Sequence, residues 1–421
     1  MGKIYDIAII GGGAAGLFAA AALSSLKEKG AGIEVVLLEK MHKCGLKIGI
    51  TGKGRCNVTN TKPWNEFALH VHPKNVFFKN AFYGMDNTAV MSFFESIGLP
   101  LVVERGDRVF PQSMRAQDVS AVMERHIEKN GIQIMRNTPV VSLQKLEASV
   151  CDGNFGGGEE LFSITTESSG KILAKSVIVA TGGMSYPKTG STGDGYIFAK
   201  GLGHKISTCF PSLTALRPRN YTEEYHGISL KNVALQLLVN GDVVQEEFGD
   251  MDFTNGGIEG PIGFKLSRKA VFSMVNGQKV SLIMDMKPAV PLQQLQQRIQ
   301  RELETIKGNK LSGVLHKLLP GKLVPLFMLG NKDLTLENLA QRLKCWSFPI
   351  EGYVGYERCV VTAGGVSLQE VSQKTLESKL VKGLYFAGEV LDLDGDTGGY
   401  NLQIAFSTGA LAATSAFKAT R

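Results

Sequence analysis

Three glycines near the N-terminus have the spacing that binding of a dinucleotide pyrophosphate requires. Gly11, Gly13 and Gly16 form the pattern G-x-G-x-x-G, with Ala14 and Ala15 between the last two. The first glycine allows a tight turn, the second lets the backbone approach a phosphate, and the third lets a helix pack closely on a strand. A helix that begins here directs free N–H groups and positive dipole at the phosphates. We therefore predict a dinucleotide site at this turn.

An acid and two apolar runs complete this pattern. The run Ile4–Ile10 precedes the glycines, an alanine-rich segment follows them, and a second run, Val35–Leu38, ends in Glu39. Glu39 lies 23 residues beyond Gly16, where a carboxylate accepts hydrogen bonds from a ribose diol. The order strand, glycine turn, helix, strand and acid predicts a Rossmann-like unit, and an ordinary strand–helix turn is the alternative.

The segment after Glu39 is rich in both basic residues and glycines. This composition suits a loop that directs backbone N–H groups and cations at one phosphate and sugar ligand. A flexible surface loop is the alternative, and the position directly after the acid favours the ligand interpretation. The residues that we predict to contact the ligand here are Lys40, Gly45, Lys47, Gly52, Gly54, Arg55, Cys56 and Asn57.

Two further strand-to-glycine junctions follow later in the chain. The apolar strand Ala174–Ala180 runs into Thr181, Gly182 and Gly183, small residues that leave room for a cofactor. The strand Leu384–Ala387 runs into Gly388 and Glu389, and an apolar helix then extends to about Phe417. The start of this helix can stabilise negative charge on a ligand, although a purely structural helix is the alternative. The predicted contacts at this start are Gly399, Tyr400, Asn401, Leu402 and Gln403.

The bulk composition excludes several classes of protein. Hydrophobic residues make up 43% and charged residues 20% of the 421 positions, as in ordinary globular proteins. The net charge is +7, and no run of five basic residues occurs, so the positive excess is interpreted as spread along the chain. A solvated basic surface is therefore favoured over a nucleic-acid patch, and nucleic acid is judged an unlikely partner.

Cysteine spacing and hydropathy limit the cellular context. The six cysteines form no C-x-x-C pair, so we expect no metal site. Without a signal peptide, this favours a reduced, cytoplasmic compartment. No stretch reaches 18 apolar residues, so no membrane span is expected.

The pattern of elements divides the chain into two domains. Residues 1–203 and 356–421 have the texture of one α/β nucleotide-binding domain, and residues 204–355 that of an insertion. The insertion is predicted to be β-rich over 204–262, about 279–290 and 346–355, and helical over about 291–345. A glycine-rich hairpin is predicted at Asp152–Gly158.

Taken together, the motifs resemble FAD enzymes of the glutathione-reductase-like superfamily with two dinucleotide-binding folds. More closely, the chain resembles the YhiN/BaiN-like flavoproteins, also called the aminoacetone oxidase family. The resemblance implies an α/β fold: a Rossmann-like FAD-binding domain with an inserted β-barrel-like and helical cap domain. It is carried by Gly45–Lys47, Thr51–Asn60, Gly182-Gly183 with Tyr186-Pro187, Thr362–Val366, and Gly388-Glu389 with Gly398–Gln403.

The resemblance also assigns roles to residues of this chain. It implies that Gly11–Gly16 hold the FAD pyrophosphate and that Glu39 binds the adenosine ribose. Val140 would flank the adenine through its backbone, and the Lys47–Asn57 loop would approach the flavin. Gly399–Gln403 would place a helix N-terminus at the N1/O2 edge of the flavin, where the reduced form carries negative charge.

The function that follows is an FAD-dependent oxidoreductase acting on a small organic substrate, through an activated C=C bond of an unsaturated ketone. NADH or NADPH would serve as a transient electron donor, because only one complete G-x-G-x-x-G is present. The alternatives are a flavin-dependent amine oxidase using dioxygen and a non-catalytic, flavin-bearing sensor or RNA-associated protein. A plain NAD dehydrogenase would leave Gly388–Gln403 unexplained.

Neither residue type nor spacing identifies a catalytic acid, base or nucleophile in the sequence. Cys44 and Cys56 lie where disulfide reductases of the superfamily keep a redox pair, but their spacing of twelve residues departs from that pattern. Disulfide reduction is therefore disfavoured. The sequence leaves the catalytic residues, the substrate and the oligomeric state open.

Overall fold

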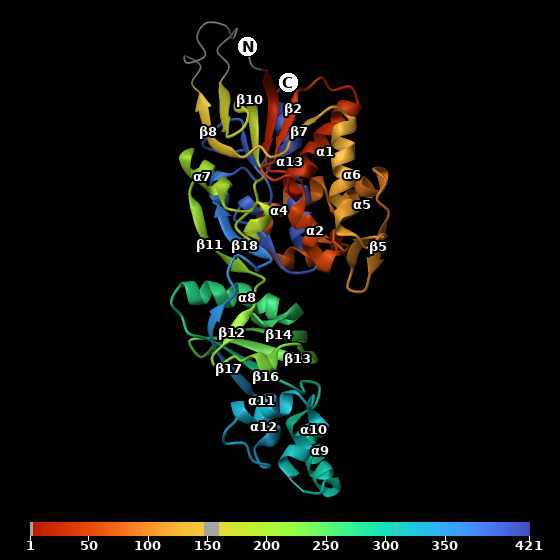
Figure 1. The fold of residues 1–421 in the computed structure, drawn as a ribbon, viewed down its shortest axis with the longest axis vertical. Coiled ribbons are helices and arrows are strands. Elements are labelled where there is room, and N and C mark those ends of the chain that lie inside the picture. Colours follow the sequence, from red (N-terminus) through yellow and green to blue (C-terminus); the bar gives the residue numbers. More distant parts are fainter. Residues whose placement is uncertain (1–2, 147–159, 309) are drawn as a thin grey trace. The chain divides into compact units, whose positions relative to one another are not determined.

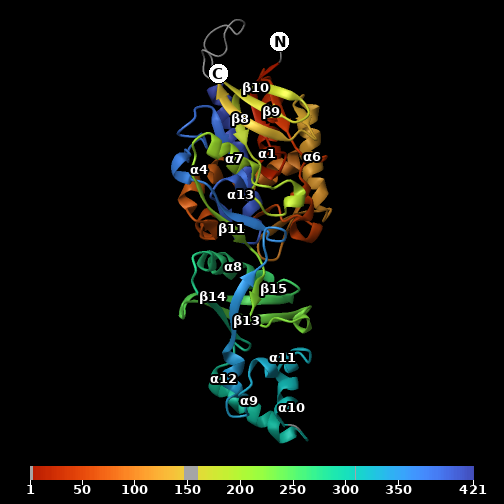
Figure 2. The same ribbon diagram turned by 60° about the vertical axis from the view of Figure 1, so that its left-hand side comes forward.

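The structure is a computed structural model that describes residues 3–146, 160–308 and 310–421. The chain divides into two compact units, one formed by the residues up to Cys209 and from Val361 onward, the other by Phe210–Val360. We call them unit 1 and unit 2, and Figures 1 and 2 show the elements of each. The hairpin predicted at Asp152–Gly158 lies outside the described residues.

Unit 1 is built on a seven-stranded sheet with the order β7-β2-β1-β10-β9-β8, in which β19 also pairs with β10. Five strands are parallel: β1 (Ile4–Ile10), β2 (Val35–Leu38), β7 (Gln133–Met135), β10 (Gly170–Val179) and β19 (Leu384–Phe386). Their near-continuous apolar sequences suit strands that are covered on both faces. The antiparallel strands β9 (Leu161–Thr166) and β8 (Val140–Leu146) extend the sheet. The predicted Rossmann-like α/β domain is therefore confirmed.

Helices cover this sheet, and two of them approach each other closely. Helix α1 (Ala14–Glu28) packs against α13 (Tyr400–Ala419) and α6 (Ala116–Lys129). A Cβ at Gly409 of α13 would stand 2.4 Å from the carbonyl oxygen of Ala15, so this crossing requires glycine. The other long helices of unit 1 are α4 (Asn75–Gly84), α5 (Asn87–Ser96) and α7 (Asp194–Gly201).

Short elements surround the ends of the parallel strands. The segment interpreted as a loop after Glu39 contains a short helix, α2 (Leu46–Ile50), and a 3-10 turn, Thr51–Gly54. This helix was not predicted, because isolated glycines interrupt the helical periodicity in so short a segment. The remaining short elements are β3 (Thr59–Asn60), α3 (Trp64–Phe67), β4 (Val71–His72), β5 (Leu101–Glu104), β6 (Arg108–Pro111), β11 (Ile206–Ser212), β18 (Val361–Val366) and β20 (Asp394–Gly395).

Unit 2 contains a closed barrel with the strand order β12-β15-β14-β13-β16-β17. Buried and partly exposed residues alternate along β16, as expected for a strand with one face in a barrel core. The predicted β-barrel-like insertion is confirmed. Helix α8 (Gly260–Val275) packs on β14 and β13. The strands are β12 (Leu216–Pro218), β13 (Ile228–Val239), β14 (Asp242–Thr254), β15 (Gly257–Glu259), β16 (Val280–Asp285) and β17 (Trp346–Tyr353).

Four helices follow β16 and precede β17 in unit 2. They are α9 (Leu292–Thr305), α10 (Lys310–Leu318), α11 (Leu323–Gly330) and α12 (Leu339–Lys344). Helix α12 contacts β16, and α9 packs on both α12 and α10 (Figure 1). The predicted helical part of the insertion is thus present. Among the described residues, no helix is long and apolar enough to cross a membrane.

Candidate dinucleotide-binding site

The turn after β1 brings the glycines into direct contact with the end of β10. A Cβ at Gly11 would lie 2.6 Å from the carbonyl oxygen of Ala180, and a Cβ at Gly16 only 1.8 Å from that of Gly11. Gly13 differs, because no described atom beyond its chain neighbours lies within 4 Å of where its Cβ would stand. Such space beside the first residues of α1, Ala14 and Ala15, is what a bound phosphate requires. Gly11 and Gly16 therefore serve packing, whereas Gly13 leaves room for a ligand.

Glu39 is buried at the end of β2 with its carboxylate toward this turn. Its Oε2 accepts a hydrogen bond from the Gly12 N–H at 2.7 Å, and its Oε1 accepts one from the Met41 N–H at 2.7 Å. Burial raises the pKa of Glu39, although these hydrogen bonds and the charge of Lys40 oppose the rise. Each carboxylate oxygen keeps a further lone pair. The side chain can therefore still accept a ribose hydroxyl.

Val140, which we predict to flank the adenine, follows two residues after a backbone contact with this acid. It is the first residue of β8 and pairs with Thr166. Two residues earlier, the Thr138 N–H donates to the carbonyl oxygen of Glu39 at 2.9 Å. This hydrogen bond thus links the segment of Glu39, the predicted ribose contact, to the segment that leads to Val140, the predicted adenine contact.

A polar network joins four motifs that are far apart in the sequence. The Glu389 carboxylate pairs with Lys47 Nζ at 2.8 Å and accepts hydrogen bonds from Ser185 Oγ at 2.7 Å and the Thr362 N–H at 2.8 Å. Lys47 Nζ also donates to Ser185 Oγ. Thr362 Oγ1 accepts from the backbone N–H of Met184 at 2.8 Å. We call Lys47, Ser185, Thr362 and Glu389 the four-motif network.

The network explains both the charge state of Glu389 and a neighbouring glycine. Burial alone would raise the pKa of Glu389, but Lys47 and the donors at Thr362 and Ser185 outweigh burial and hold the pKa below its usual value. A Cβ at Gly183 would stand 2.5 Å from Thr362 Oγ1, so the loop packs this tightly only with glycine. Lys47, Gly183 and Glu389 were predicted site residues, whereas the roles of Ser185 and Thr362 were missed.

The basic residues predicted to face the ligand are each held by an acid. Lys40 Nζ pairs with Asp194 at 2.7 Å, and Lys47 pairs with Glu389. Arg55 pairs with Glu104 at 3.1 Å, and its guanidinium lies 4.4 Å from the centre of the Phe110 ring. These cations therefore do not present unpaired charge, and the backbone N–H groups of the same segment are the better candidates for phosphate contacts.

The segment from Gly52 to Asn57 has an unusual backbone. Gly52, Lys53, Gly54 and Cys56 have φ values of 57°, 58°, 85° and 60°. Lys53 and Cys56 adopt this left-handed region without being glycine, a strain that clusters at ligand sites. Gly45, earlier in the same segment, also has a positive φ of 67° and packs against Ser120. Successive N–H groups in such a backbone form an anion-binding concavity.

Two buried polar atoms next to these features have no hydrogen-bond partner. They are Asn57 Oδ1, at the end of this segment, and Thr181 Oγ1, directly after β10. Such unpaired groups are rare in folded proteins. Together with the open space at Gly13, they fit a polar ligand such as the FAD that the resemblance implies. Gly182 continues the junction with a φ of 74°.

The side chains at the start of α13 point into the protein rather than toward a ligand. Gln403 is buried and donates to the carbonyl oxygen of Met85 at 2.9 Å, and Asn401 donates to that of Gly395 at 2.7 Å. Tyr400 packs edge-on against Phe67 with ring centres 4.8 Å apart. A ligand contact at Gly399–Gln403 would therefore be made by the backbone. Leu402 is half-buried, and Gly388 packs against Ala15.

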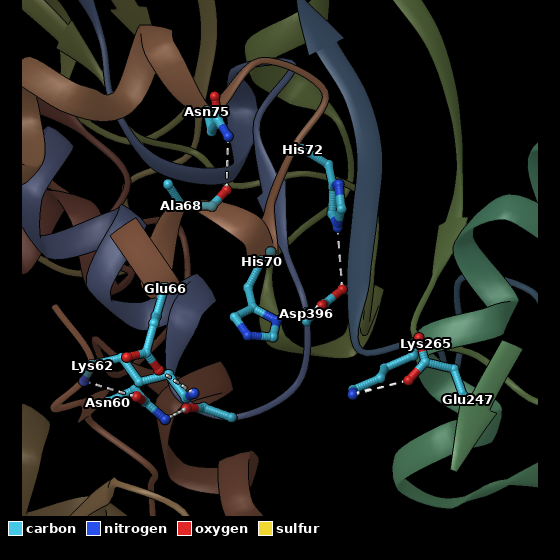
Figure 3. A network of polar contacts seen from close by, with 12 residues as sticks. Asn60, Lys62, Glu66, Ala68, His70, His72, Asn75, Glu247, Lys265 and Asp396 are labelled. Atoms are coloured by element: carbon cyan, nitrogen blue, oxygen red, sulfur yellow. Dashed lines mark hydrogen bonds and ion pairs between the residues drawn. The ribbon is translucent and has the colours of Figure 1, made fainter. Parts of the chain in front are cut away.

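A histidine pair lies beside the first residue of α13. Asp396 bonds His70 Nδ1 at 2.8 Å and His72 Nε2 at 3.2 Å (Figure 3). The His70 ring stacks on Tyr400 with centres 4.4 Å apart. Burial raises the pKa of Asp396, but the two imidazoles outweigh it and lower this pKa to about 2. The only sequence signal is the H-x-H spacing, and the structure places His70 at the end of a 3-10 turn and His72 in the strand β4 that follows it.

The cysteines near the predicted flavin loop are inert thiols. Cys44 and Cys56 are free and fully buried. Burial raises the pKa of each thiol to about 12, so neither forms the thiolate that attacks a disulfide. Among the described residues, no group of three or more histidines, cysteines and acids could hold a metal ion.

Comparisons with known proteins identify relatives along the whole chain. A family model described as "HI0933-like protein Rossmann domain" matches residues 5–415. A 3-dehydro-bile acid delta(4,6)-reductase of Clostridium scindens is 30% identical, covering 97% of this chain and 98% of the relative. A ribosomal RNA dihydrouridine synthase of Haemophilus influenzae is 28% identical and covers 97% of both chains. This second name removes the support for judging nucleic acid an unlikely partner.

A solved structure shows the same fold at low identity. The crystal structure of 3-ketosteroid delta1-dehydrogenase from Sterolibacterium denitrificans aligns with a TM-score of 0.53 and 12% identity. The alignment covers 99% of this chain and 100% of that chain. At this identity the likeness concerns the fold alone.

Proposed function

Because the chain belongs to the HI0933-like Rossmann family of FAD-dependent oxidoreductases, we propose that it reduces a ring C=C bond conjugated with a carbonyl group. NADH or NADPH is the proposed source of electrons. The product gains one hydride and one proton across the double bond, and the pyridine nucleotide is oxidised to NAD⁺ or NADP⁺.

One observation carries this proposal: two relatives with different substrates are named for the same change. A delta(4,6)-reductase and a dihydrouridine synthase each saturate a ring C=C bond. In a 3-oxo steroid with a delta-4 bond, and in uracil, that bond is conjugated with a ring carbonyl. Hydride then adds to the carbon remote from the carbonyl, and a proton adds to the adjacent carbon. The shared chemistry is therefore a better guide than either substrate.

Residues of unit 1 are our candidates for holding the cofactor that this chemistry needs. Bound FAD would supply the hydride. We propose that Gly13 and the start of α1 hold its pyrophosphate, and that Glu39 holds a ribose. Asn57 Oδ1 and Thr181 Oγ1, which have no partner in the protein, would form hydrogen bonds with the same ligand. The four-motif network would keep the surrounding loops together, because it ties Lys47 and Glu389 to the Gly183 junction.

The reaction also needs a proton, and the histidine pair is our candidate for supplying it. His70 and His72 share Asp396 and adjoin the start of α13, the helix that the resemblance directs at the flavin. Imidazole side chains exchange protons near neutral pH, and the shared carboxylate fixes the orientation of both rings. In H70Q and H72Q variants we expect slower reoxidation by substrate and unchanged reduction by NADH or NADPH.

The test is an anaerobic reaction in two stages, followed by visible absorption. NADH or NADPH is added first, and the flavin bands should bleach. An unsaturated 3-oxo steroid or a uridine-containing RNA is added second, and the bands should return while the substrate gains two hydrogen atoms by mass spectrometry. Bands that bleach only with an amine and return with dioxygen would favour an amine oxidase instead, and the proposal would be wrong.

A further inference from the structure

The positive charge of this protein is concentrated in one short part of the sequence. The chain as a whole carries a net charge of +7. Between Leu292 and Lys344, the four helices α9–α12 and their connections contain nine lysines and arginines but only four acids. This segment therefore contributes +5, and the rest of the chain contributes +2. The earlier interpretation, that the excess is spread along the chain, was wrong because it considered only runs of adjacent residues.

The acids of this segment neutralise few of its bases. Arg298 pairs with Glu302 at 3.9 Å and Arg342 pairs with Asp333, while Lys344 pairs with Asp285 on β16 at 2.7 Å. Six other bases are exposed, and among the residues that the structure describes none has a carboxylate oxygen within 4.0 Å. They are Arg301, Lys307, Lys310, Lys317, Lys322 and Lys332. An ordinary solvated helix surface instead mixes charges of both signs.

Helix α9 adds a neutral polar surface to these cations. It buries Leu295 and Ile299 within unit 2. Half of its ten exposed residues are glutamines: Gln293, Gln294, Gln296, Gln297 and Gln300. Glutamine side chains donate hydrogen bonds to phosphate and sugar oxygens without adding negative charge. We call these glutamines and the six unpaired bases the basic helical surface.

We propose that the basic helical surface binds the phosphate backbone of a structured RNA. Cations without carboxylate partners gain the most from a polyanion, because their binding releases the counterions condensed on it. Donor amides beside them match the phosphate and sugar contacts that position such a ligand. The choice of RNA rests on the proposed function, because the uracil bases of RNA contain the conjugated C=C bond that this function would reduce.

A membrane surface is a poorer match for the same charges. Helices that lie in a membrane interface combine basic residues with a large apolar face that enters the lipid. The apolar residues Leu295 and Ile299 of α9 are already buried. Leu292, its first residue, is 41% exposed, but the other exposed residues of α9 are polar or charged. Charge without an apolar face favours a hydrated polyanion, so RNA is preferred to lipid.

The experiment measures RNA binding by the FAD-loaded full chain as a function of salt. The probe is a fluorescein-labelled RNA hairpin with uridines in its loop, followed by fluorescence anisotropy. The test variant carries K307Q, K310Q and K317Q. Its control carries K129Q, K171Q and K200Q, three exposed lysines of unit 1. Both variants lose three charges, so overall charge alone cannot separate them.

The expected result is a difference in salt dependence between the two variants. Each lost phosphate contact lowers the slope of log Kd against log salt by about 0.7–0.9, so the test variant should lose about two to three units of slope. Its Kd should rise about tenfold or more near physiological salt, and the control should match the unaltered protein. FAD content and reduction by NADH or NADPH should be equal in all three.

Each other outcome decides the question. Equal binding by the test variant and the control would overturn the basic helical surface. The same holds if the unaltered protein ignores the hairpin and binds vesicles of phosphatidylserine and phosphatidylcholine. If RNA binds as expected but no uridine or steroid is reduced, the surface stands and the proposed function fails. If a free steroid is reduced but RNA is not bound, the proposed function stands and the basic helical surface fails.

Discussion

Replacing Gly13 by alanine should separate binding of the cofactor from folding of the protein. Gly13 precedes α1 with φ of −78° and ψ of −167°, a conformation that alanine adopts without strain. No described atom beyond its chain neighbours lies within 4 Å of the added methyl group. The change in the free energy of unfolding of the FAD-free protein should therefore stay within about 1 kcal/mol. The methyl group would instead occupy the space that we assign to the pyrophosphate.

The size of the effect follows from the linkage between binding and folding. At an FAD concentration one hundred times the Kd, bound ligand adds about 2.7 kcal/mol to the stability of the unaltered protein. For a chain of 421 residues in two units, that is a rise in Tm of roughly 3–5 °C. The G13A variant should show at most about half of this rise, because an affinity that is at least about tenfold lower removes ~1.4 kcal/mol or more of the ligand's contribution.

Two further variants complete the assay, which compares Tm with and without FAD and the flavin content after purification. Gly84, the last residue of α4, also has no described atom within 4 Å of its missing Cβ, so G84A is a matched control that should retain FAD. G16A should instead weaken the FAD-free protein, since its Cβ would stand 1.8 Å from the carbonyl oxygen of Gly11. Full FAD content in G13A, with an unchanged rise in Tm, would refute the placement of the pyrophosphate.

Three other changes test the surroundings of the site. In E389Q the polar network loses its charge, and urea unfolding should show a loss of about 1.5–3 kcal/mol; an unchanged midpoint would mean that the network is not stabilising. The pKa of Asp396 is lowered from 3.8 to about 2, which stabilises the fold by about 2 kcal/mol above pH 3.8; this stability is lost as the pH falls toward 2. The D396N variant should lack that part of the acid unfolding transition. Identical profiles of stability against pH for the variant and the unaltered protein would contradict this. A thiol reagent at pH 8 should modify exposed Cys345, whereas Cys44 and Cys56 should react only after unfolding. Rapid labelling of Cys44 and Cys56 in the folded protein would again support the hypothesis of disulfide reductase activity.

The local elements of this fold could be predicted because short stretches of sequence determine them. The apolar run Ile4–Ile10 and the glycines after it have one compatible structure, and β1 and α1 formed as expected. The helix Ala116–Lys129 has an apolar stripe at helical spacing, with Val119, Val122 and Ile127 buried. In each case the period of the apolar residues and the turn residues agree.

The contacts of the candidate site were less predictable because they join distant residues. Lys47 and Glu389 were both expected to face a cofactor, but nothing in their neighbourhoods shows that each is the partner of the other. Likewise Gln403 was expected to contact a ligand because it lies at the start of the last helix, whereas its amide donates to the carbonyl oxygen of Met85. Residue type indicates that a polar group needs a partner, and only the fold decides which partner it has.

The closeness of the two ends of unit 2 has a consequence for how this protein can evolve. Within unit 2 the Val360 N–H donates to the carbonyl oxygen of Leu213 at 3.2 Å, and within unit 1 Gly364 lies against the backbone of Thr208. The chain thus leaves and re-enters unit 1 through adjoining strands. Closing a loop costs only about 0.6 kcal/mol more for each doubling of its length. Insertions of very different length and surface charge could therefore be exchanged at this junction, while the nucleotide-binding unit stays the same.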